Sequence, residues 1–301
     1  EFMSGHISRC LGEDFKKFDY SKTSRSPAYD LALVTRVLSY DSKTQTSISE
    51  FDCPADAWFF KDNTSKIPHC ILMEILLQNA GVLTSLERAP LKMKKKDLCF
   101  RNLDATATLT KLPDLKGKTI TNVAKVTGFK LIRGNMAIHR FECSLSTKQD
   151  GVFYKCETSF GWFTPETMAQ QIGLDGGRKI GLYHEREDLK LRKISSISTQ
   201  SRSRPNMLRL VDKRTVHISE NYIMGSCKVD PTAFFFKCHF VGDPVTPGSI
   251  GVEMAIELLE MYVVECGICV FEHEREREKR TTTHLTQQEY ILHLITRIFF
   301  F

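Results

Sequence analysis

The first half of the chain combines strand-like stretches with one stretch of helical spacing. Ile71, Leu72, Ile75 and Leu76 place apolar side chains on one helical face after Pro68. We therefore expect a buried helix from Pro68 to about residue 86. The other stretches are apolar and β-branched, alternating or aromatic, and they predict strands. These predicted strands are 31–39, 46–51, 57–60, 106–112, 119–129, 136–145 and 152–162, with a hairpin turn at 150–151.

Strands, one long helix and then a run of antiparallel strands indicate an α+β unit in which a helix packs on a curved sheet. This pattern restarts after residues 176–206, which begin with Gly-Gly, continue through a Ser- and Arg-rich run and are typical of a linker. Two further strands are expected at 208–216 and 223–229. The sequence therefore predicts a second unit that begins like the first.

Two pairs of segments echo one another across the linker. Asp-Pro-Thr-Ala-Phe-Phe-Phe-Lys at 230–237 resembles Pro-Ala-Asp-Ala-Trp-Phe-Phe-Lys at 54–61. Pro-Gly-Ser-Ile-Gly-Val-Glu at 247–253 resembles Pro-His-Cys-Ile-Leu-Met-Glu at 68–74, and both lead into apolar helices. Self-similarity of this kind indicates an internal duplication.

The second copy is incomplete, because the helix expected to end near Glu265 is followed by a charged run and a short apolar tail in place of strands. We interpret this tail as foreign to the fold. The predicted organisation is an N-terminal extension at 1–29, a first unit at 30–175, a linker at 176–206, an incomplete second unit at 207–265 and the tail at 266–301.

Composition narrows the functional classes. Apolar residues make up 42% of the 301 residues, which is enough for a sizeable core. The net charge of +6 is spread along the chain and does not form the dense basic face of a nucleic-acid binder. The local Met-Lys-Lys-Lys patch at 93–96 is either a solvated surface or a docking site for an acidic partner. No apolar run approaches the ~20 residues of a membrane span.

The ten cysteines lack the spacing of a small disulfide-bonded domain, and no charged-then-apolar leader is present. We therefore expect a cytoplasmic protein with reduced thiols. Cys266, Cys269, His273 and His284 superficially resemble zinc ligands. A single Cys-x-x-Cys without a second pair is weak evidence, so we expect no metal.

The strongest chemical signal is His239, which ends an apolar run and precedes the turn Asp-Pro-Val-Thr-Pro-Gly at 243–248. A histidine moves a proton near neutral pH. The N–H of Gly248, at the start of the predicted helix, could polarise a thioester carbonyl. A lone histidine in an apolar strand is more often structural than catalytic, but the stiff turn behind it shifts that balance.

Glu74 and Glu253 each lie about one turn into their predicted helices. Such carboxylates can simply be partners of the helix dipole. If the two copies pack as a pseudo-dimer, however, the helix of one copy can present its acid to the histidine of the other. Only the second copy has the histidine, because its counterpart region contains Asp62 and Asn63. We therefore expect one complete pair, His239 with Glu74, while Glu253 faces a site without a base.

Residues 230–264 resemble the active-site segment of β-hydroxyacyl-[acyl carrier protein] dehydratases of the hotdog fold, through His-Phe-x-Gly-Asp-Pro-Val-x-Pro-Gly-x-x-Gly at 239–251. Residues 50–175 are similar to a dehydratase region of polyunsaturated fatty acid synthases. The segments that carry this second similarity are Ala-Trp-Phe-Phe-Lys (57–61), Ile-Leu-Met-Glu-Ile-x-x-Gln (71–78), Thr-Ser-Phe-Gly-Trp-Phe-Thr-Pro-Glu (158–166) and Gln-Ile-Gly-Leu-Asp (171–175).

The resemblance covers roughly residues 30–265 and implies an α+β double hotdog, in which each repeat is a long helix wrapped by an antiparallel sheet and the second repeat is truncated. It also implies a hydro-lyase of fatty acid biosynthesis, which dehydrates carrier-bound 3-hydroxyacyl thioesters to 2-enoyl thioesters. In that mechanism His239 removes the α-proton and Glu74 protonates the leaving hydroxyl. The Gly248 N–H would hold the thioester oxygen and the Val245 carbonyl would orient the imidazole.

Two further residues are candidates for supporting roles. Gln78 shares the helical face of Glu74 and is either a hydrogen-bonding neighbour or a surface residue. Asp243 belongs to the turn itself. The resemblance implies no cofactor other than the phosphopantetheine of an acyl carrier protein, which would be the partner that carries the acyl thioester, and the chain could form a homodimer. The alternatives are a hotdog thioesterase, which the turn disfavours, and a non-catalytic module for acyl-chain or carrier docking.

Overall fold

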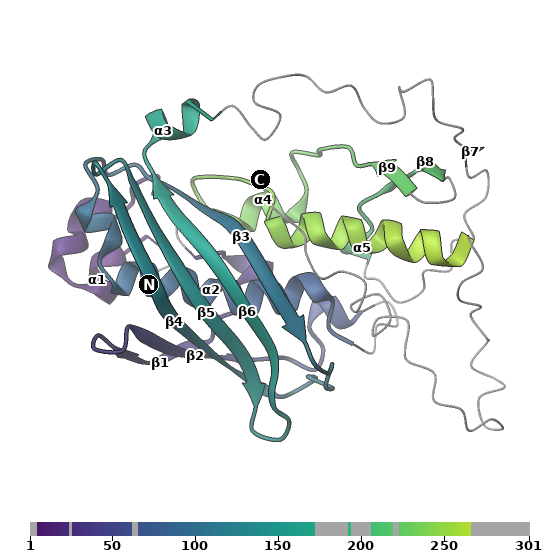
Figure 1. The fold of residues 1–301 in the computed structure, drawn as a ribbon, viewed down its shortest axis with the longest axis horizontal. Coiled ribbons are helices and arrows are strands. Elements are labelled where there is room, and N and C mark those ends of the chain that lie inside the picture. The colour runs from purple at the N-terminus through teal and green to yellow at the C-terminus, as the bar shows by residue number, and fades with distance from the viewer. Residues whose placement is uncertain are drawn as a thin grey trace.

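One antiparallel sheet and one long helix form the main body of the protein. In the computed structural model the sheet has six strands in the order β1-β2-β4-β5-β6-β3, and it curves around helix α2, His69–Leu86 (Figure 1). The strands are β1 Arg36–Asp41, β2 Thr46–Asp52, β3 Cys99–Leu109, β4 Thr119–Ile132, β5 Met136–Thr147 and β6 Gly151–Phe163. The structure describes residues 5–23, 26–61, 66–171, 192–193, 206–218 and 223–265.

Helix α2 forms the centre of the core. It begins directly after Pro68, as the sequence predicts, and every residue from Cys70 to Ala80 is buried. A helix that is buried on all sides needs protein around it, and the curved sheet provides much of that cover. By length and composition α2 alone among the described helices could cross a membrane, but 78% of its apolar window is buried inside the protein, as expected of a core helix.

A buried polar cluster fixes α2 against the sheet. The Asn79 amide donates to the backbone carbonyls of Ser47, on β2, and Asn122, on β4, over 3.1 and 3.0 Å, and it accepts from the Ser47 hydroxyl at 2.9 Å. Asn122 in turn donates to the carbonyls of Ile75 and Leu76. Because these groups are shielded from water, each bond fixes the rotation and height of the helix relative to the strands.

The C-terminal part of the chain packs beside this body. Its long helix α5, Gly248–Glu265, lies against α2 and is preceded by the short helix α4, Phe234–Cys238 (Figure 1). A three-stranded sheet accompanies it, ordered β7 Arg192–Lys193, β8 Asp212–Ile218 and β9 Ile223–Ser226. The remaining short elements are α1 Ile7–Leu11, α3 Pro165–Ala169, η1 Glu13–Phe18, η2 Tyr29–Leu31, η3 Trp58–Phe60, η4 Ala89–Lys92 and η6 Asn206–Leu208.

The predicted strand at 57–60 is wrong, because residues 58–60 form the 3₁₀ turn η3. The apolar run before His239 is likewise the helix α4, and His239 is the residue that ends it. Both segments are too short for periodicity to separate strand from helix. The strand expected to start at residue 208 also begins later, at Asp212, after the turn η6. The predicted linker at 176–206 and the tail at 266–301 lie almost entirely outside the described residues.

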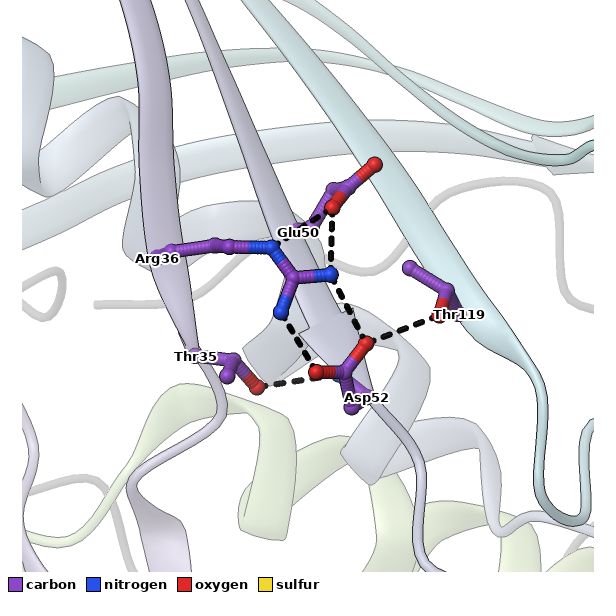
Figure 2. Close-up of polar contacts among 5 residues, drawn as sticks. All are labelled: Thr35, Arg36, Glu50, Asp52 and Thr119. Carbon is purple, nitrogen blue, oxygen red and sulfur yellow. Dashed lines mark hydrogen bonds and ion pairs between the residues drawn. The ribbon is translucent and has the colours of Figure 1, made fainter.

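The N-terminal segment contributes to the main core, although the sequence suggested a simple extension. Ile7, Phe15 and Phe18 are buried in the same apolar cluster as α2. At an exposed site, Arg36 ties edge strand β1 to the neighbouring strand β2 (Figure 2). Its guanidinium binds Glu50 at 2.8 Å and Asp52 at 2.5 and 3.0 Å, and these hydrogen bonds raise its pKa.

Replacing Asn79 by alanine should lower the free energy of unfolding by about 2 kcal/mol, because three buried polar groups lose their partner. Urea denaturation monitored by circular dichroism measures this change. Arg36→Ala is the control, since it also removes a polar network but at an exposed site, and it should have the smaller effect. Equal midpoints for Asn79→Ala and the parent protein would show that the cluster does not hold the helix in place.

Candidate active site

The sequence around His239 folds into a closed turn. Phe240 and Asp243 exchange backbone hydrogen bonds of 3.0 and 3.1 Å, and the Val245 N–H donates to the His239 carbonyl at 2.8 Å. Gly242 adopts a φ of 90°, a left-handed conformation that favours glycine. The backbone therefore fixes the position of His239 before any side chain contributes.

The same turn orients the imidazole. His239 Nδ1 lies 3.1 Å from the Val245 carbonyl oxygen. A carbonyl only accepts hydrogen bonds, so Nδ1 carries the proton and Nε2 of the neutral ring keeps its lone pair. Burial lowers the pKa of His239 from its ordinary value, while the nearby Glu74 carboxylate acts in the opposite direction. The ring is therefore held as a neutral base at neutral pH.

Glu74 is buried on α2 and accepts hydrogen bonds at both of its oxygens. The Ser249 hydroxyl, at the start of α5, donates to Oε1 at 2.7 Å, and the Gln78 amide donates to Oε2 at 3.2 Å. Gln78 is itself buried, donates to the Leu31 carbonyl and accepts from the Leu33 N–H. Gln78 is therefore a neighbour of the acid and does not lie at the surface.

His239 and Glu74 are 165 positions apart in the chain, yet the Val245 carbonyl that contacts His239 and the Ser249 hydroxyl that contacts Glu74 come from one short segment that leads into the first turn of α5. Glu74 reaches that turn through Ser249, and its charge acts on His239. Gly248 is the first residue of α5, and N–H groups in a first turn have no partner within the helix. A base, an acid and a helix N-terminus are thus gathered at one place.

The other glutamate makes the reciprocal contact. Glu253, buried on α5, accepts a hydrogen bond of 3.1 Å from the backbone N–H of Cys70, at the start of α2. Cys70 and Ser249 occupy equivalent positions in the two echoed segments. Each glutamate therefore reaches the first turn of the other helix. Asp62 and Asn63, the expected counterparts of His239, lie outside the described residues.

Two residues escaped the sequence reasoning. Ser249 donates to Glu74, and its equivalence to Cys70 in the echoed segments is the signal that could have found it. Arg101, on β3, forms two hydrogen bonds with Asp243. Nothing in the sequence linked these two residues, because 142 positions separate them.

Within the residues that the structure describes, no three histidine, cysteine, aspartate or glutamate side chains gather as a metal site. The suspected ligands Cys266, Cys269, His273 and His284 lie outside those residues.

Two solved structures are distantly similar to this chain. One is the dehydratase heterocomplex ApeI:P of Xenorhabdus doucetiae, which is 13% identical with a TM-score of 0.38 over 48% of this chain and 92% of that one. Another is a mutant of the thioesterase PA1618 of Pseudomonas aeruginosa, 12% identical with a TM-score of 0.32 over 42% of this chain and 80% of that one.

Comparison of sequences is more informative. Residues 203–290 match the model of the FabA-like domain. A polyunsaturated fatty acid synthase subunit of Thraustochytrium sp. (strain ATCC 26185 / S-3) is 43% identical over 304 aligned residues, which cover 88% of this chain. The chain spans 20% of that relative's length. The resemblance predicted from the sequence is confirmed: residues 203–290 match the FabA-like domain, and the chain is similar over most of its length to a segment of a polyunsaturated fatty acid synthase.

Proposed function

We propose that this protein dehydrates 3-hydroxyacyl thioesters to 2-enoyl thioesters, as a hydro-lyase of fatty acid biosynthesis. The observation that carries the proposal is that a half-buried, neutral His239 lies within electrostatic reach of a buried Glu74 from another helix. The ring is oriented by the Val245 carbonyl, so its Nε2 lone pair is available to a substrate. The FabA-like match and the synthase relative support the same reaction class.

The reaction requires two proton transfers, in which one residue removes a proton from the substrate and another delivers a proton to it. His239 Nε2 takes the proton from the substrate Cα, and the electron pair of that C–H bond moves into the new Cα–Cβ double bond. The Gly248 N–H stabilises the negative charge that develops on the thioester oxygen. Protonated Glu74 gives its proton to the β-hydroxyl, the Cβ–O bond breaks and water leaves. Hydration of the enoyl thioester is the reverse of these steps.

Ser249 and Gln78 prepare the acid for this role. With one donor on each oxygen, the Glu74 carboxyl group is fixed in direction, and proton transfer requires such alignment. Gln78 is held in turn by the backbone of residues 31 and 33, so a rigid part of the first unit supports the acid. Asp243 supports the base from the other side, because it belongs to the turn.

We also infer that the chain contains two hotdog repeats, at 30–175 and 207–265, with the second incomplete. Corresponding residues make corresponding contacts in support of this view. Gln78 accepts from the Leu33 N–H, and Glu257, its equivalent on α5, accepts from the Leu210 N–H at 2.9 Å. Leu33 and Leu210 are themselves equivalent, in Leu-Ala-Leu-Val and Leu-Arg-Leu-Val.

The aromatic segments support the same inference. Trp58 and Phe234 occupy equivalent positions and pack against each other edge-on, with ring centroids 5.3 Å apart. The turns that hold them are the same, since the N–H of Ala57 bonds to a carbonyl three residues earlier and so does that of Ala233. Contact between equivalent residues is expected on a two-fold axis that relates two repeats.

The substrate would arrive on the phosphopantetheine arm of an acyl carrier protein, in the cytoplasm. The turn of His239 lies beside a basic surface that suits such a partner. Gly242 lies next to the backbone of Lys22, whose N–H is 3.3 Å from the Asp97 carboxylate. The neighbouring Lys94 and Lys96 are exposed. Positive charge at the mouth of a site attracts an acidic partner and steers its approach.

The catalytic pair is tested by the hydration of crotonyl-N-acetylcysteamine, followed by loss of enoyl absorbance. We expect His239→Asn and Glu74→Gln each to lower kcat by about 10²- to 10⁴-fold. Glu253→Gln is the matched control and should stay within about threefold of the parent, because it alters the equivalent acid without a histidine partner. Hydration that survives in His239→Asn would overturn the assignment. Release of free thiol would favour a thioesterase, and inactivity with intact carrier binding would favour a docking module.

The protonation of His239 gives an independent test by ¹⁵N NMR of the ring. We expect the Nδ1–H tautomer and a titration midpoint below the ordinary 6.5, because burial lowers the pKa. Accordingly kcat/KM for dehydration of a 3-hydroxyacyl thioester, the direction in which neutral His239 is the base, should fall as the pH drops through that lowered pKa. In Glu74→Gln the midpoint should move further down, since the opposing carboxylate is lost. If the titration midpoint of His239 is the same in Glu74→Gln as in the parent, Glu74 does not act electrostatically on His239.

If the carrier protein docks on this surface, charge reversal there should affect a carrier-bound substrate but not a small thioester substrate. Lys94→Glu/Lys96→Glu should raise KM for crotonyl-carrier protein by roughly tenfold, and more weakly at high salt, since it reverses the charge that attracts the carrier. Its kcat/KM for crotonyl-N-acetylcysteamine should not change. Lys43→Glu/Lys148→Glu, two exposed lysines in the β1–β2 and β5–β6 turns, provides the charge-matched control. Equal effects on both substrates would reject this surface.

A further inference from the structure

An ion pair joins the turn of His239 to the sheet of the first unit. The Arg101 guanidinium, on β3, donates to the two Asp243 carboxylate oxygens at 2.6 and 3.1 Å. This paired geometry is the strongest form of arginine–carboxylate contact, because both hydrogen bonds are charge-assisted and parallel. The Arg101 side chain is 22% exposed and that of Asp243 is 19% exposed, so solvent weakens this ion pair less than it would weaken a fully exposed one.

Asp243 lies at a point where the turn has little freedom. Its backbone N–H and carbonyl both bond to Phe240, the residue after His239. The Phe240 ring also contacts Phe100, which precedes Arg101 on β3, with centroids 6.4 Å apart. A displacement of the Asp243 side chain therefore moves the backbone that carries the imidazole.

Arg101 is itself held in place. Its Nη1 donates to the Phe100 carbonyl at 2.8 Å in addition to Asp243, and its backbone is paired with Gly161 of β6. Strand β3 belongs to the same sheet that wraps α2, the helix that carries Glu74. The guanidinium consequently links the base, on the second unit, to the framework that holds the acid, on the first.

We propose that Arg101 is a positioning residue, which fixes the distance between His239 and Glu74 by holding Asp243 against β3. The inference rests on the proposed function of these two residues. Proton transfer requires alignment of the reacting groups within about 1 Å, and misplacement on that scale costs on the order of 10² in rate. The turn keeps its own backbone hydrogen bonds without Arg101, so the rate should suffer more than the fold.

The test uses crotonyl-N-acetylcysteamine hydration together with urea unfolding. Arg101→Gln and Asp243→Asn should each lower kcat by roughly 10- to 100-fold, with KM within about threefold, because the groups are misaligned and the substrate contacts remain. Arg101→Lys should recover only part of the rate, since an ammonium group cannot make the paired contact. The exposed Arg140→Gln on β5 is the control and should match the parent.

A charge swap separates positioning from general structural support. Arg101→Asp/Asp243→Arg restores an ion pair between the same two places, and it should recover more activity than either single change. The ¹⁵N–¹H signal of His239 Nδ1 should broaden in Arg101→Gln and sharpen again in the swap. This signal does not depend on turnover. If the parent lacks hydratase activity, the proposed function fails while the signal still tests the link. An unchanged signal and kcat in Arg101→Gln would overturn the inference.

Discussion

The site depends on the reciprocal contact between two core helices. Glu74 on α2 accepts a hydrogen bond from the first turn of α5, and Glu253 on α5 accepts one from the first turn of α2. A buried carboxylate is costly unless it is hydrogen-bonded, and each helix supplies the donor that the other needs. Each acid therefore accepts one of its hydrogen bonds from the opposite helix. The same contacts that make the pairing of the helices specific also place an acid beside the turn of His239.

Much of this arrangement could be predicted from the sequence, because its signals are local. The spacing of apolar residues and the turn-forming residues predict the helix from Pro68, four of the strands of the main sheet and the turn before Gly248. The echo between residues 68–74 and 247–253 extended these signals to a pairing of distant residues, and it placed Glu74 near His239. Local pattern failed for the aromatic segments that end in Lys61 and Lys237, because three apolar residues in a row fit a strand and a helical turn equally well.

Long-range polar contacts could not be predicted from the sequence, for a different reason. The pairing of Arg101 with Asp243 depends on where β3 lies in the sheet and on how the turn after α4 is tilted toward it. Neither is encoded in the residues next to them. The burial of Gln78 is similar: its helical position was evident, but the backbone of residues 31 and 33 that covers it comes from outside the helix. Such contacts follow from the assembled fold and not from any segment of it.

The two halves differ most where the chemistry requires it. Helix α5 begins with Gly248, which has no side chain between its backbone N–H and a substrate, whereas α2 begins with His69 at the equivalent position. His69 is half-buried, its Nε2 lies 3.1 Å from the Tyr154 hydroxyl, and desolvation of the ring lowers its pKa to about 4. It is therefore neutral and engaged in the core at neutral pH. In the two-repeat arrangement that we propose, one half keeps an open helix start beside His239, while the other contributes Glu74 and a rigid interior. Under the proposed function, both carboxylates serve the packing of the helices and only Glu74 serves catalysis.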